Sequence, residues 1–305
     1  MKLVFVSFIY LIISFAMPDE FKTGSASFDQ NQKPLFTFGL IADVQYSDYD
    51  PAGTRYYRES ISKLREALSS LKEDSADFII NLGDLIDKDF KSFKPVLDII
   101  DSSGLKTYHI TGNHDYSVEP RLKKHLAEIQ SFKKGYYSFA YEKIRFIFLN
   151  GNELSTYASN YKSEIKDAAD YIEALKNEGS INAVDWNGGI GRKQLDWLRD
   201  ELNKSKEADE KVILFCHFPV WPENIHNLLN YKEVLSLLGN YQNIAAWFNG
   251  HNHAGNYGNF NMIHFVTFKG MVETDAINSF ALVEVYKNKI WIRGYGRVKS
   301  QILAY

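Results

Sequence analysis

The feature that most constrains the fold of this chain is a set of short apolar segments, each followed at once by carboxylate, amide or imidazole side chains. These segments cover residues 36–42, 78–82, 107–110, 212–216 and 245–248. The polar residues that follow them are Asp43 with Gln45, Asp84 with Asp87, Asn113 with His114 and Asp115, His217, and His251 with His253. In open α/β sheets, ligands bind beyond the carboxyl ends of the strands, where several loops converge. We therefore expect these side chains to meet at one edge of a sheet.

From residue 34 onward, short apolar strands alternate with amphipathic helices, which is typical of a layered α/β architecture. Further strands are expected at 145–149, 263–268, 280–286 and 290–295, and helices at 56–72, 93–102, 119–132, 163–177, 192–203 and 231–238. A chain of 305 residues, 45% of them hydrophobic, can build one large globular domain, which we place at residues 34–305.

The first residues differ from the rest, because Lys2 precedes an apolar run at 3–16 that resembles a secretory signal. We interpret residues 1–26 as signal peptide and leader, with cleavage after Ala16 or Ala26; a buried first strand is the alternative. The run is too short for a comfortable membrane span, so no stable span is expected after cleavage. The protein would then be exported to a periplasm or secreted, and otherwise cytoplasmic.

Composition excludes some partners. A formal net charge of -3 without a long basic run argues against a track for nucleic-acid phosphates. Cys216 is the only cysteine, so no intramolecular disulfide can form and cysteine usage does not identify the compartment. We expect the protein to be a monomer.

Oxygen and nitrogen donors of the types found after the strands suit Mn, Fe, Zn or Mg. Two such cations about 3.5 to 4 Å apart can share a carboxylate and clamp the attacking and leaving oxygens of a phosphoryl group. Each group alone has an ordinary explanation, since an aspartate after a strand is often a turn or helix cap. Their occurrence together, each behind an apolar strand, favours a metal site.

These groups resemble the motifs of the calcineurin-like metallophosphoesterase superfamily: Asp-x-His, Gly-Asp-x-x-Asp, Gly-Asn-His-Asp/Glu, His, and Gly-His-x-His. Gln45 departs from this pattern, because a histidine is usual there. Glutamine at this position resembles the manganese-dependent ADP-ribose/CDP-alcohol diphosphatases. The segments at 53–58, 186–190, 217–222, 270–274 and 294–298 are also similar to that group.

The resemblance implies a four-layer αββα sandwich of two mixed sheets and two divalent metal ions, with Mn²⁺ first and Mg²⁺, Fe or Zn²⁺ as alternatives. The first metal would be held by Asp43, Gln45, Asp84 and His253, and the second by Asp84, Asn113, His217 and His251. Asp84 is then the bridging ligand, and the neutral oxygen of Gln45 favours a harder ion. His114 and Asn113 are the implied catalytic residues, while Asp87 and Asp115 orient ligands or cap turns.

Aromatic and cationic residues near these motifs are candidates for substrate binding, because a nucleobase can stack on a ring and an arginine can pair with a phosphate. The candidates are Tyr46, Arg55, Tyr56, Trp186, Trp221 and Tyr257. His226 could also face a substrate, whereas His109, His125 and His264 are interpreted as structural or solvent-exposed. The side chain of Cys216 is expected to point away from the metals.

The function implied by the resemblance is hydrolysis of the phosphoanhydride of nucleoside diphosphate conjugates. ADP-ribose would give AMP and ribose 5-phosphate, and a CDP-alcohol would give CMP and a phosphoalcohol. One alternative is a phosphodiesterase or phosphomonoesterase of the same superfamily that acts on cyclic nucleotides or phosphoproteins. The other is a metal-binding module without catalytic activity, which would have no chemical need for His114 beside the complete ligand set.

Overall fold

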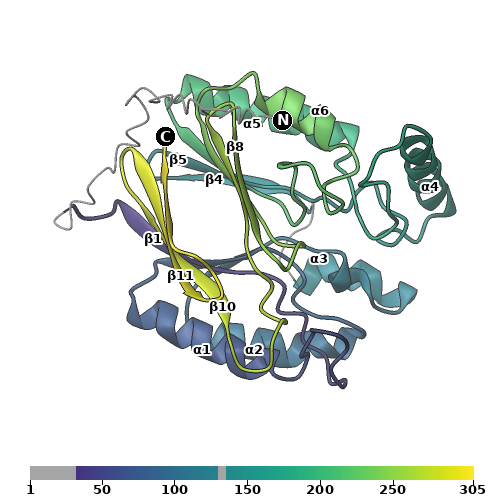
Figure 1. Cartoon of the computed structure of the whole chain (residues 1–305), viewed down its shortest axis with the longest axis horizontal. Coiled ribbons are helices and arrows are strands. Elements are labelled where there is room, and N and C mark those ends of the chain that lie inside the picture. The colour runs from purple at the N-terminus through teal and green to yellow at the C-terminus, as the bar shows by residue number, and fades with distance from the viewer. Residues whose placement is uncertain (1–31, 130–134) are drawn as a thin grey trace, which may run out of the picture. The chain divides into compact units, whose positions relative to one another are not determined.

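The computed structural model describes residues 32–129 and 135–305, and within them two six-stranded sheets pack face to face with helices on their outer sides. Figure 1 shows α1 (Ser60–Glu73) and α2 (Phe93–Ser103) below the sandwich, and α5 (Arg192–Glu207) and α6 (Tyr231–Leu238) above it. This arrangement confirms the predicted four-layer αββα sandwich of mixed sheets.

The first sheet has the strand order β12-β11-β10-β1-β2-β3. Its strands are β1 (Phe36–Ile41), β2 (Phe78–Asn81), β3 (Thr107–His109), β10 (Ser279–Val285), β11 (Lys289–Gly296) and β12 (Gln301–Ala304). β1, β2 and β3 run parallel, so their carboxyl ends lie at the same edge, whereas β10, β11 and β12 are joined by antiparallel pairing.

The second sheet has the order β4-β5-β6-β7-β9-β8. Its strands are β4 (Tyr137–Tyr141), β5 (Ile144–Phe148), β6 (Lys211–Phe215), β7 (Ile244–Asn249), β8 (Asn256–Phe260) and β9 (Ile263–Thr267). β5, β6, β7 and β9 are parallel, and the two edge strands pair antiparallel with their neighbours.

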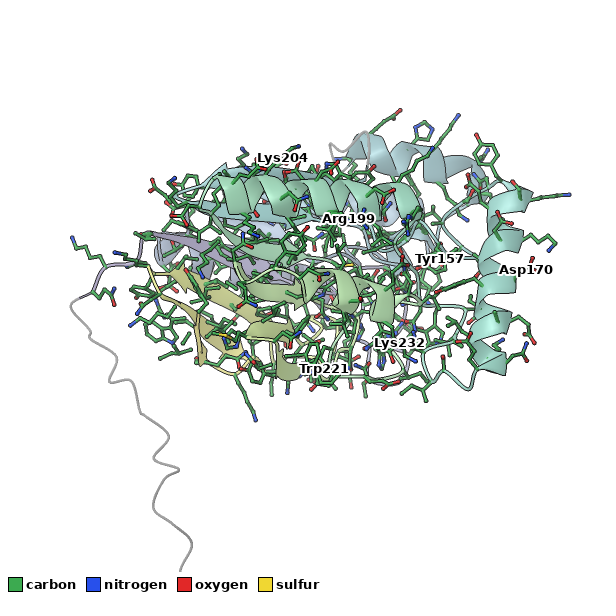
Figure 2. All side chains as sticks on the ribbon, turned by 90° about the horizontal axis from the view of Figure 1, so that it is seen from above. Tyr157, Asp170, Arg199, Lys204, Trp221 and Lys232 are labelled. Carbon is green, nitrogen blue, oxygen red and sulfur yellow. The ribbon has the colours of Figure 1, made fainter. Side chains whose placement is uncertain are left out.

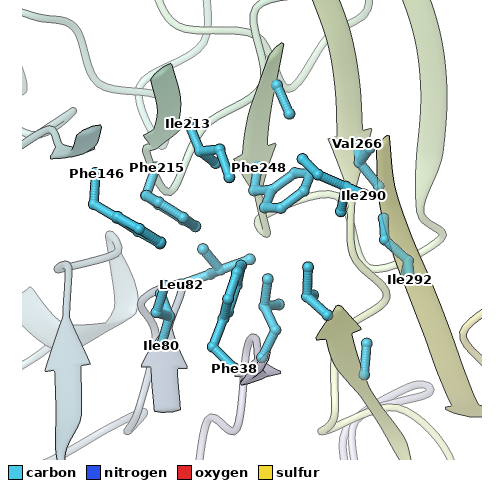
Figure 3. Packing of buried hydrophobic residues seen from close by; sticks show 14 of the residues in the cluster. Phe38, Ile80, Leu82, Phe146, Ile213, Phe215, Phe248, Val266, Ile290 and Ile292 are labelled. Atoms are coloured by element: carbon cyan, nitrogen blue, oxygen red, sulfur yellow. The ribbon is translucent and has the colours of Figure 1, made fainter. Parts of the chain in front are cut away.

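Three apolar layers hold these elements together. The middle layer lies between the sheets, where Phe38, Phe146, Phe215 and Phe248 are buried and interdigitate with aliphatic side chains (Figure 3). The outer layers pack the sheets against their helices. Because both faces of the central strands are covered, these strands appear in the sequence as continuous apolar runs.

The remaining helical segments are short or peripheral. They are η1 (Phe90–Ser92), η2 (His114–Tyr116), η3 (Pro120–His125), α3 (Leu126–Ile129) and α4 (Lys162–Asn177). Figure 1 and Figure 2 both place α4 at one end of the molecule, apart from the helices that cover the sheets. Among the described residues, no helix is both long and apolar enough to cross a membrane.

The structure corrects several predicted elements. The helix expected at 56–72 begins only at Ser60, because the backbone before it pairs with another segment: Arg55 forms an isolated β-bridge with Glu273, and residues 57–59 form a turn. The helix expected at 119–132 is a 3₁₀ segment followed by α3, and its predicted end lies outside the described residues. The prediction omitted β4, β8 and β12, which are short strands at the sheet edges in which at most one residue is buried. The proposed signal peptide at 1–26 also lies outside the described residues and stays a prediction.

Candidate metal centre

The seven predicted ligands converge where the strand ends of the two sheets meet. Asp43 and Gln45 follow β1, Asp84 follows β2, Asn113 follows β3, His217 follows β6, and His251 and His253 follow β7. One donor atom from each of Asp84, His217 and His251 lies within 4.8 Å of the other two. Loops from both sheets therefore contribute to one cluster, which we call the cavity floor.

One half of the cavity floor joins residues that follow β1 and β7. Asp43 Oδ1 lies 3.4 Å from His253 Nε2. The Gln45 Nε2 atom lies 3.1 Å from Asp84 Oδ2 and 3.0 Å from His253 Nε2. This amide nitrogen thus stands between two acceptors that would bind a cation, and a half-turn of the amide would bring Oε1 to the same place.

The other half contains two further imidazoles. His217 Nε2 lies 3.2 Å from Asp84 Oδ2, while His217 Nδ1 donates to Leu82 O at 2.8 Å. His251 Nε2 lies 2.9 Å from Asn187 Oδ1, and an amide oxygen can only accept from that nitrogen. These bonds leave His217 Nε2 and His251 Nδ1 with lone pairs available for a metal.

Unpaired buried acceptors test whether the site fits metal ions. Gln45 Oε1 and Asn113 Oδ1 are buried and form no hydrogen bond within the described chain. A buried polar atom left without a partner costs about 1 to 3 kcal/mol, so two in one cluster need an explanation. Neutral oxygen and nitrogen donors beside two carboxylates fit divalent cations, and these residues therefore suit a metal centre.

The backbone at four of the ligands adopts the left-handed conformation that favours glycine. The φ angles are 52° at Asp43, 43° at Gln45, 56° at Asp84 and 66° at His251. Residues other than glycine in this region are uncommon and cluster at functional sites, where the surrounding structure compensates for the strain. Four of the seven residues of the cavity floor therefore have a strained backbone, which indicates a functional site.

Two glycines allow the loops to approach closely. A Cβ atom on Gly112 would lie 2.0 Å from Asp84 Oδ1, and one on Gly250 would lie 2.6 Å from Asp43 Oδ2. Any side chain at either position would displace a carboxylate of the cavity floor. The Gly-Asn-His and Gly-His segments therefore need glycine at these positions because there is no space for a Cβ atom.

The surroundings of two imidazoles of the cavity floor, His217 and His253, favour positive charge. Burial by itself lowers the pKa of His217, but the negative charge of Asp84 outweighs it and raises that pKa to about 9. Burial opposes the effect of Asp43 on His253 in the same way, and the pKa of His253 is raised to about 9. The field that draws protons onto these nitrogens would draw a divalent cation to the same atoms.

Asp115 braces the loops beneath the ligands. Its carboxylate is buried and accepts from the backbone N–H groups of Asp84 at 3.0 Å, Leu85 at 2.8 Å and Gly112 at 2.9 Å. It thereby ties the loop after β2 to the loop after β3. The predicted orienting role of Asp115 agrees with this geometry.

His114 lies between a carboxylate and a guanidinium. Its Nδ1 is 3.0 Å from Asp87 Oδ1, and its Nε2 is 3.3 Å from Arg55 Nη1. Because Asp87 is buried, its contact with Nδ1 fixes the orientation of the His114 ring. His114 and Arg55 both line the cavity described next, so the two groups face whatever binds there.

A cavity of about 620 Å³ opens above the cavity floor. Gln45, Asp84, Asn113, His251 and His253 line it, while Asp43 and His217 are fully buried in contact with these residues. Arg55 and His114 line one side. The rest is formed by residues that we call the cavity wall: Tyr116, Ser117, Thr156, Tyr157, Asp185, Trp186 and His226.

Two of the predicted substrate-binding residues, Arg55 and Trp186, line this cavity. Four others lie elsewhere in the described structure: Tyr46, Tyr56, Trp221 and Tyr257. Tyr46 packs against the outer core of the first sheet, and Trp221 contacts Phe260 of β8 with ring centroids 5.0 Å apart. Figure 2 shows Trp221 apart from Tyr157 of the cavity wall.

Most of the cavity wall was not predicted from the sequence. His226 was considered as a residue that faces a substrate, and it does line the cavity. Tyr116, Ser117, Thr156, Tyr157 and Asp185 were missed because they lie in loops or short 3₁₀ turns without hydrophobic periodicity. The only available signal was position, since Tyr116 and Ser117 follow directly on the ligand loop after β3.

Two residues that hold ligand histidines in position were also not predicted from the sequence. Glu273 Oε1 lies 2.7 Å from His253 Nδ1, and Asn187 Oδ1 lies 2.9 Å from His251 Nε2. A hydrogen bond from His253 holds the pKa of Glu273 down at about 2. Both residues belong to segments noted in the sequence, at 270–274 and 186–190, but nothing in those segments indicated their roles.

The remaining histidines and the cysteine lie outside the cavity. His264 Nε2 donates to Ala304 O at 2.8 Å, and His125 pairs with Glu128. Burial lowers the pKa of His109 to about 4. Cys216 is fully buried, which raises the pKa of its thiol to about 12, as expected for an inert side chain.

Comparison with known proteins is consistent with this site. The family model described as calcineurin-like phosphoesterase matches residues 36–255. A Xenopus laevis protein named manganese-dependent ADP-ribose/CDP-alcohol diphosphatase is 30% identical over 90% of this chain and 92% of its own length. Proteins of the same name from Oryza sativa and Homo sapiens are 31% and 28% identical, over 87% and 93% of this chain.

Solved structures extend the comparison to the fold. The crystal structure of a dimetal phosphatase from Danio rerio superposes with a TM-score of 0.82 at 26% identity, over 90% of this chain and 100% of that chain. The family match spans the β1 to β7 ligand loops that build the cavity floor, and the superposition spans both sheets. This chain is therefore an enzyme, a hydrolase that belongs to the calcineurin-like phosphoesterase family.

Proposed function

We propose that this enzyme is a manganese-dependent diphosphatase that hydrolyses the phosphoanhydride of nucleoside diphosphate conjugates. ADP-ribose would yield AMP and ribose 5-phosphate, and a CDP-alcohol would yield CMP and a phosphoalcohol. The observation that carries the proposal is Gln45, whose amide occupies a ligand position on the floor of a cavity of about 620 Å³. That volume suits a nucleotide, and the relatives that share 90% of the chain are named for this activity.

The cavity floor divides into two ligand sets that share Asp84. The first metal ion would be held by Asp43, Gln45, Asp84 and His253, and the second by Asp84, Asn113, His217 and His251. When bound, two such cations supply Lewis-acid activation of a water nucleophile and offset the charge on the phosphates. The chain contributes rigidity, because Asp115 and the strained backbone hold the donors in place before any ligand arrives.

His114 and Arg55 serve the phosphates from one side of the cavity. The Arg55 guanidinium can pair with a phosphate oxygen, which would release His114 Nε2 from its contact at 3.3 Å. His114 Nδ1 remains directed at Asp87, so a proton carried on Nε2 faces the cavity. From there His114 can protonate the oxygen of the leaving phosphate group.

The cavity wall offers aromatic surface for the nucleoside. Trp186 lies with its ring centroid 5.1 Å from that of His226 and 5.3 Å from that of His251. Elsewhere in the cavity wall, the ring centroids of Tyr116 and Tyr157 are 6.1 Å apart. Bases stack on such faces with little regard for their identity, which fits an enzyme that accepts both adenosine and cytidine conjugates.

A substrate screen tests the proposal. Purified enzyme is assayed with ADP-ribose, CDP-choline, CDP-glycerol, cyclic AMP and an aryl phosphate diester, each with Mn²⁺ and with Mg²⁺. We expect the highest kcat/KM for ADP-ribose or a CDP-alcohol in Mn²⁺, with AMP or CMP as the nucleotide product. A clear preference for cyclic AMP or for the aryl diester would instead identify a phosphodiesterase of the same fold.

A further inference from the structure

The two metal-facing histidines that follow β7 differ in what holds their outer nitrogen. His253 Nδ1 lies 2.7 Å from a carboxylate oxygen of Glu273, whereas His251 Nε2 lies 2.9 Å from the amide oxygen of Asn187. A carboxylate behind an imidazole makes the ring a stronger metal ligand, and a neutral amide does so much less. The same residue type is therefore prepared differently for the two ions.

Glu273 is fixed in this position by several contacts. Its side chain is 13% exposed and also accepts a hydrogen bond from Thr54. Lys63 Nζ donates to the backbone oxygens of Glu273 at 3.2 Å and Thr274 at 2.8 Å, which ties the segment to α1. The carboxylate therefore has little freedom to move away from His253.

Asn187 is equally fixed, but it carries no charge. Its Nδ2 donates to Asn182 O at 3.0 Å and to Ile225 O at 2.7 Å. The amide oxygen must then face His251, and an exchange of its oxygen and nitrogen would lose both backbone bonds. The outer nitrogen of His217 also has a neutral partner, the Leu82 backbone oxygen.

The formal charges follow the same division. The first ligand set contains the carboxylates of Asp43 and Asp84, with Glu273 behind His253. The second set contains only the shared Asp84, because its remaining ligands are an amide and two imidazoles with neutral partners. In a buried site, each additional negative charge strengthens the attraction for a divalent cation.

We propose that Glu273 is a positioning residue that makes the first metal site the tighter of the two, so that the first ion stays bound while the second exchanges. This inference rests on the ligand sets proposed above and is independent of the substrate. It identifies the site held by Asn113, His217 and His251 as the one that sets the dependence of activity on metal concentration.

The test is a titration of metal-free enzyme with Mn²⁺, followed by electron paramagnetic resonance of the free ion. The wild type should show one tight and one weak class of site. Glu273→Gln keeps an oxygen that accepts from His253 Nδ1 but removes the charge. The dissociation constant of the tight class should rise about 10- to 100-fold, while that of the weak class stays the same.

Glu284→Gln is the matched control, because Glu284 is a buried carboxylate in β10 that bonds Tyr286 and Arg293 instead of a metal ligand. It should leave both classes as in the wild type. A second measurement does not depend on the folding of the Glu273 variant. His253→Ala should keep only a weak class of site, and His251→Ala should keep only a tight one.

Equal affinities at the two wild-type sites would overturn the proposal, as would a Glu273→Gln variant that weakens the second site or neither. A tight class that survives His253→Ala would do the same. If the wild type binds no Mn²⁺ at all, the ligand sets under the proposed function fail together with this inference. That outcome differs from equal affinities, which would leave the ligand sets standing.

Discussion

The cavity floor and the cavity wall face the same space but are built in different ways. Every floor residue lies within a few positions of a strand end, and several are tied to a neighbouring loop by a buried bond, such as the one from the Asp84 N–H group to Asp115. The wall residues come from loops and short 3₁₀ turns that the sheets do not align. The floor is thus set by the fold, and the wall can change without disturbing it.

This difference separates two aspects of function. Chemistry depends on donors held at fixed distances, and a sheet edge provides them because parallel strands end together. Substrate choice depends on the shape and stacking surface of loops, which tolerate substitution. We therefore expect substitutions in the floor to remove activity for every substrate, and substitutions in the wall to change the substrates unequally.

The largest effect is expected from Asp84→Ala. This change removes the carboxylate that both ligand sets share, so two like-charged ions lose the group that holds them together. Activity should fall by far more than the roughly 100-fold typical of residues that only support a ligand, and for all substrates alike. Metal content by atomic absorption should fall with it. A variant that keeps normal Mn²⁺ stoichiometry and rate would contradict the bridging role.

His114→Ala should give a smaller loss that depends on the leaving group. Loss of a general acid typically costs about 10² to 10⁴-fold when the leaving oxygen needs a proton. Hydrolysis of ADP-ribose should therefore suffer much more than hydrolysis of a p-nitrophenyl ester, whose leaving group departs without protonation. Metal content should stay unchanged.

Two other outcomes would change the role of His114. Equal losses on both substrates with metals retained would indicate that it stabilises charge on the phosphoryl oxygens instead. Loss of metal would place His114 among the ligands.

Substitution of Trp186 tests the cavity wall. Stacking of a base on an aromatic ring contributes about 1 to 3 kcal/mol, so Trp186→Ala should raise KM for ADP-ribose roughly 5- to 150-fold with a lesser change in kcat. Trp186→Phe should restore much of the loss. Tyr257→Ala is the matched control, because Tyr257 is 45% exposed and bonds His264 away from this cavity. Equal effects of the Trp186 and Tyr257 substitutions would contradict the assignment of the wall.

The same division explains what could be predicted from the sequence. Asp43, Asp84 and His217 were found because each follows a buried strand whose apolar run is easy to recognise. Trp221 and Tyr257 were placed at the site because they are close to ligands along the chain, but the structure directs them to β8 and its surroundings. Periodicity reports which residues face a core, and it contains no information on how a loop folds back.

The supporting contacts were hidden for a related reason. Glu273 reaches His253 from 20 residues away and Asn187 reaches His251 from 64 residues away. Such pairs depend on the packing of the complete fold. The left-handed backbone at Gln45 was equally inaccessible, because nothing in its side chain favours a positive φ. Edge strands such as β12 were missed because exposure on one side weakens their apolar pattern.

At neutral pH the smallest effect is expected at His109, which lies at the end of β3 just before the floor loop. Burial lowers the pKa of its imidazole from 6.5 to about 4. Between these values the unfolded chain binds a proton that the folded protein does not, so the free energy of unfolding falls as pH decreases from 6.5 toward 4. Above pH 6.5 the protonation of His109 does not lower the free energy of unfolding. At pH 4 it should lower that free energy by about 3 kcal/mol.

The measurement compares urea unfolding of the wild type and His109→Asn at several pH values between 7 and 4. The metal ligands contribute equally to both proteins, so the difference between the two curves isolates His109. We expect the wild type to lose more stability than the variant as pH falls, and the His109 ring resonance in NMR spectra of the folded protein to shift only near pH 4. Parallel curves, or a ring resonance that titrates near 6.5, would show that the end of β3 admits water. The end of β3 would then not belong to the rigid, water-free support that distinguishes the cavity floor from the cavity wall.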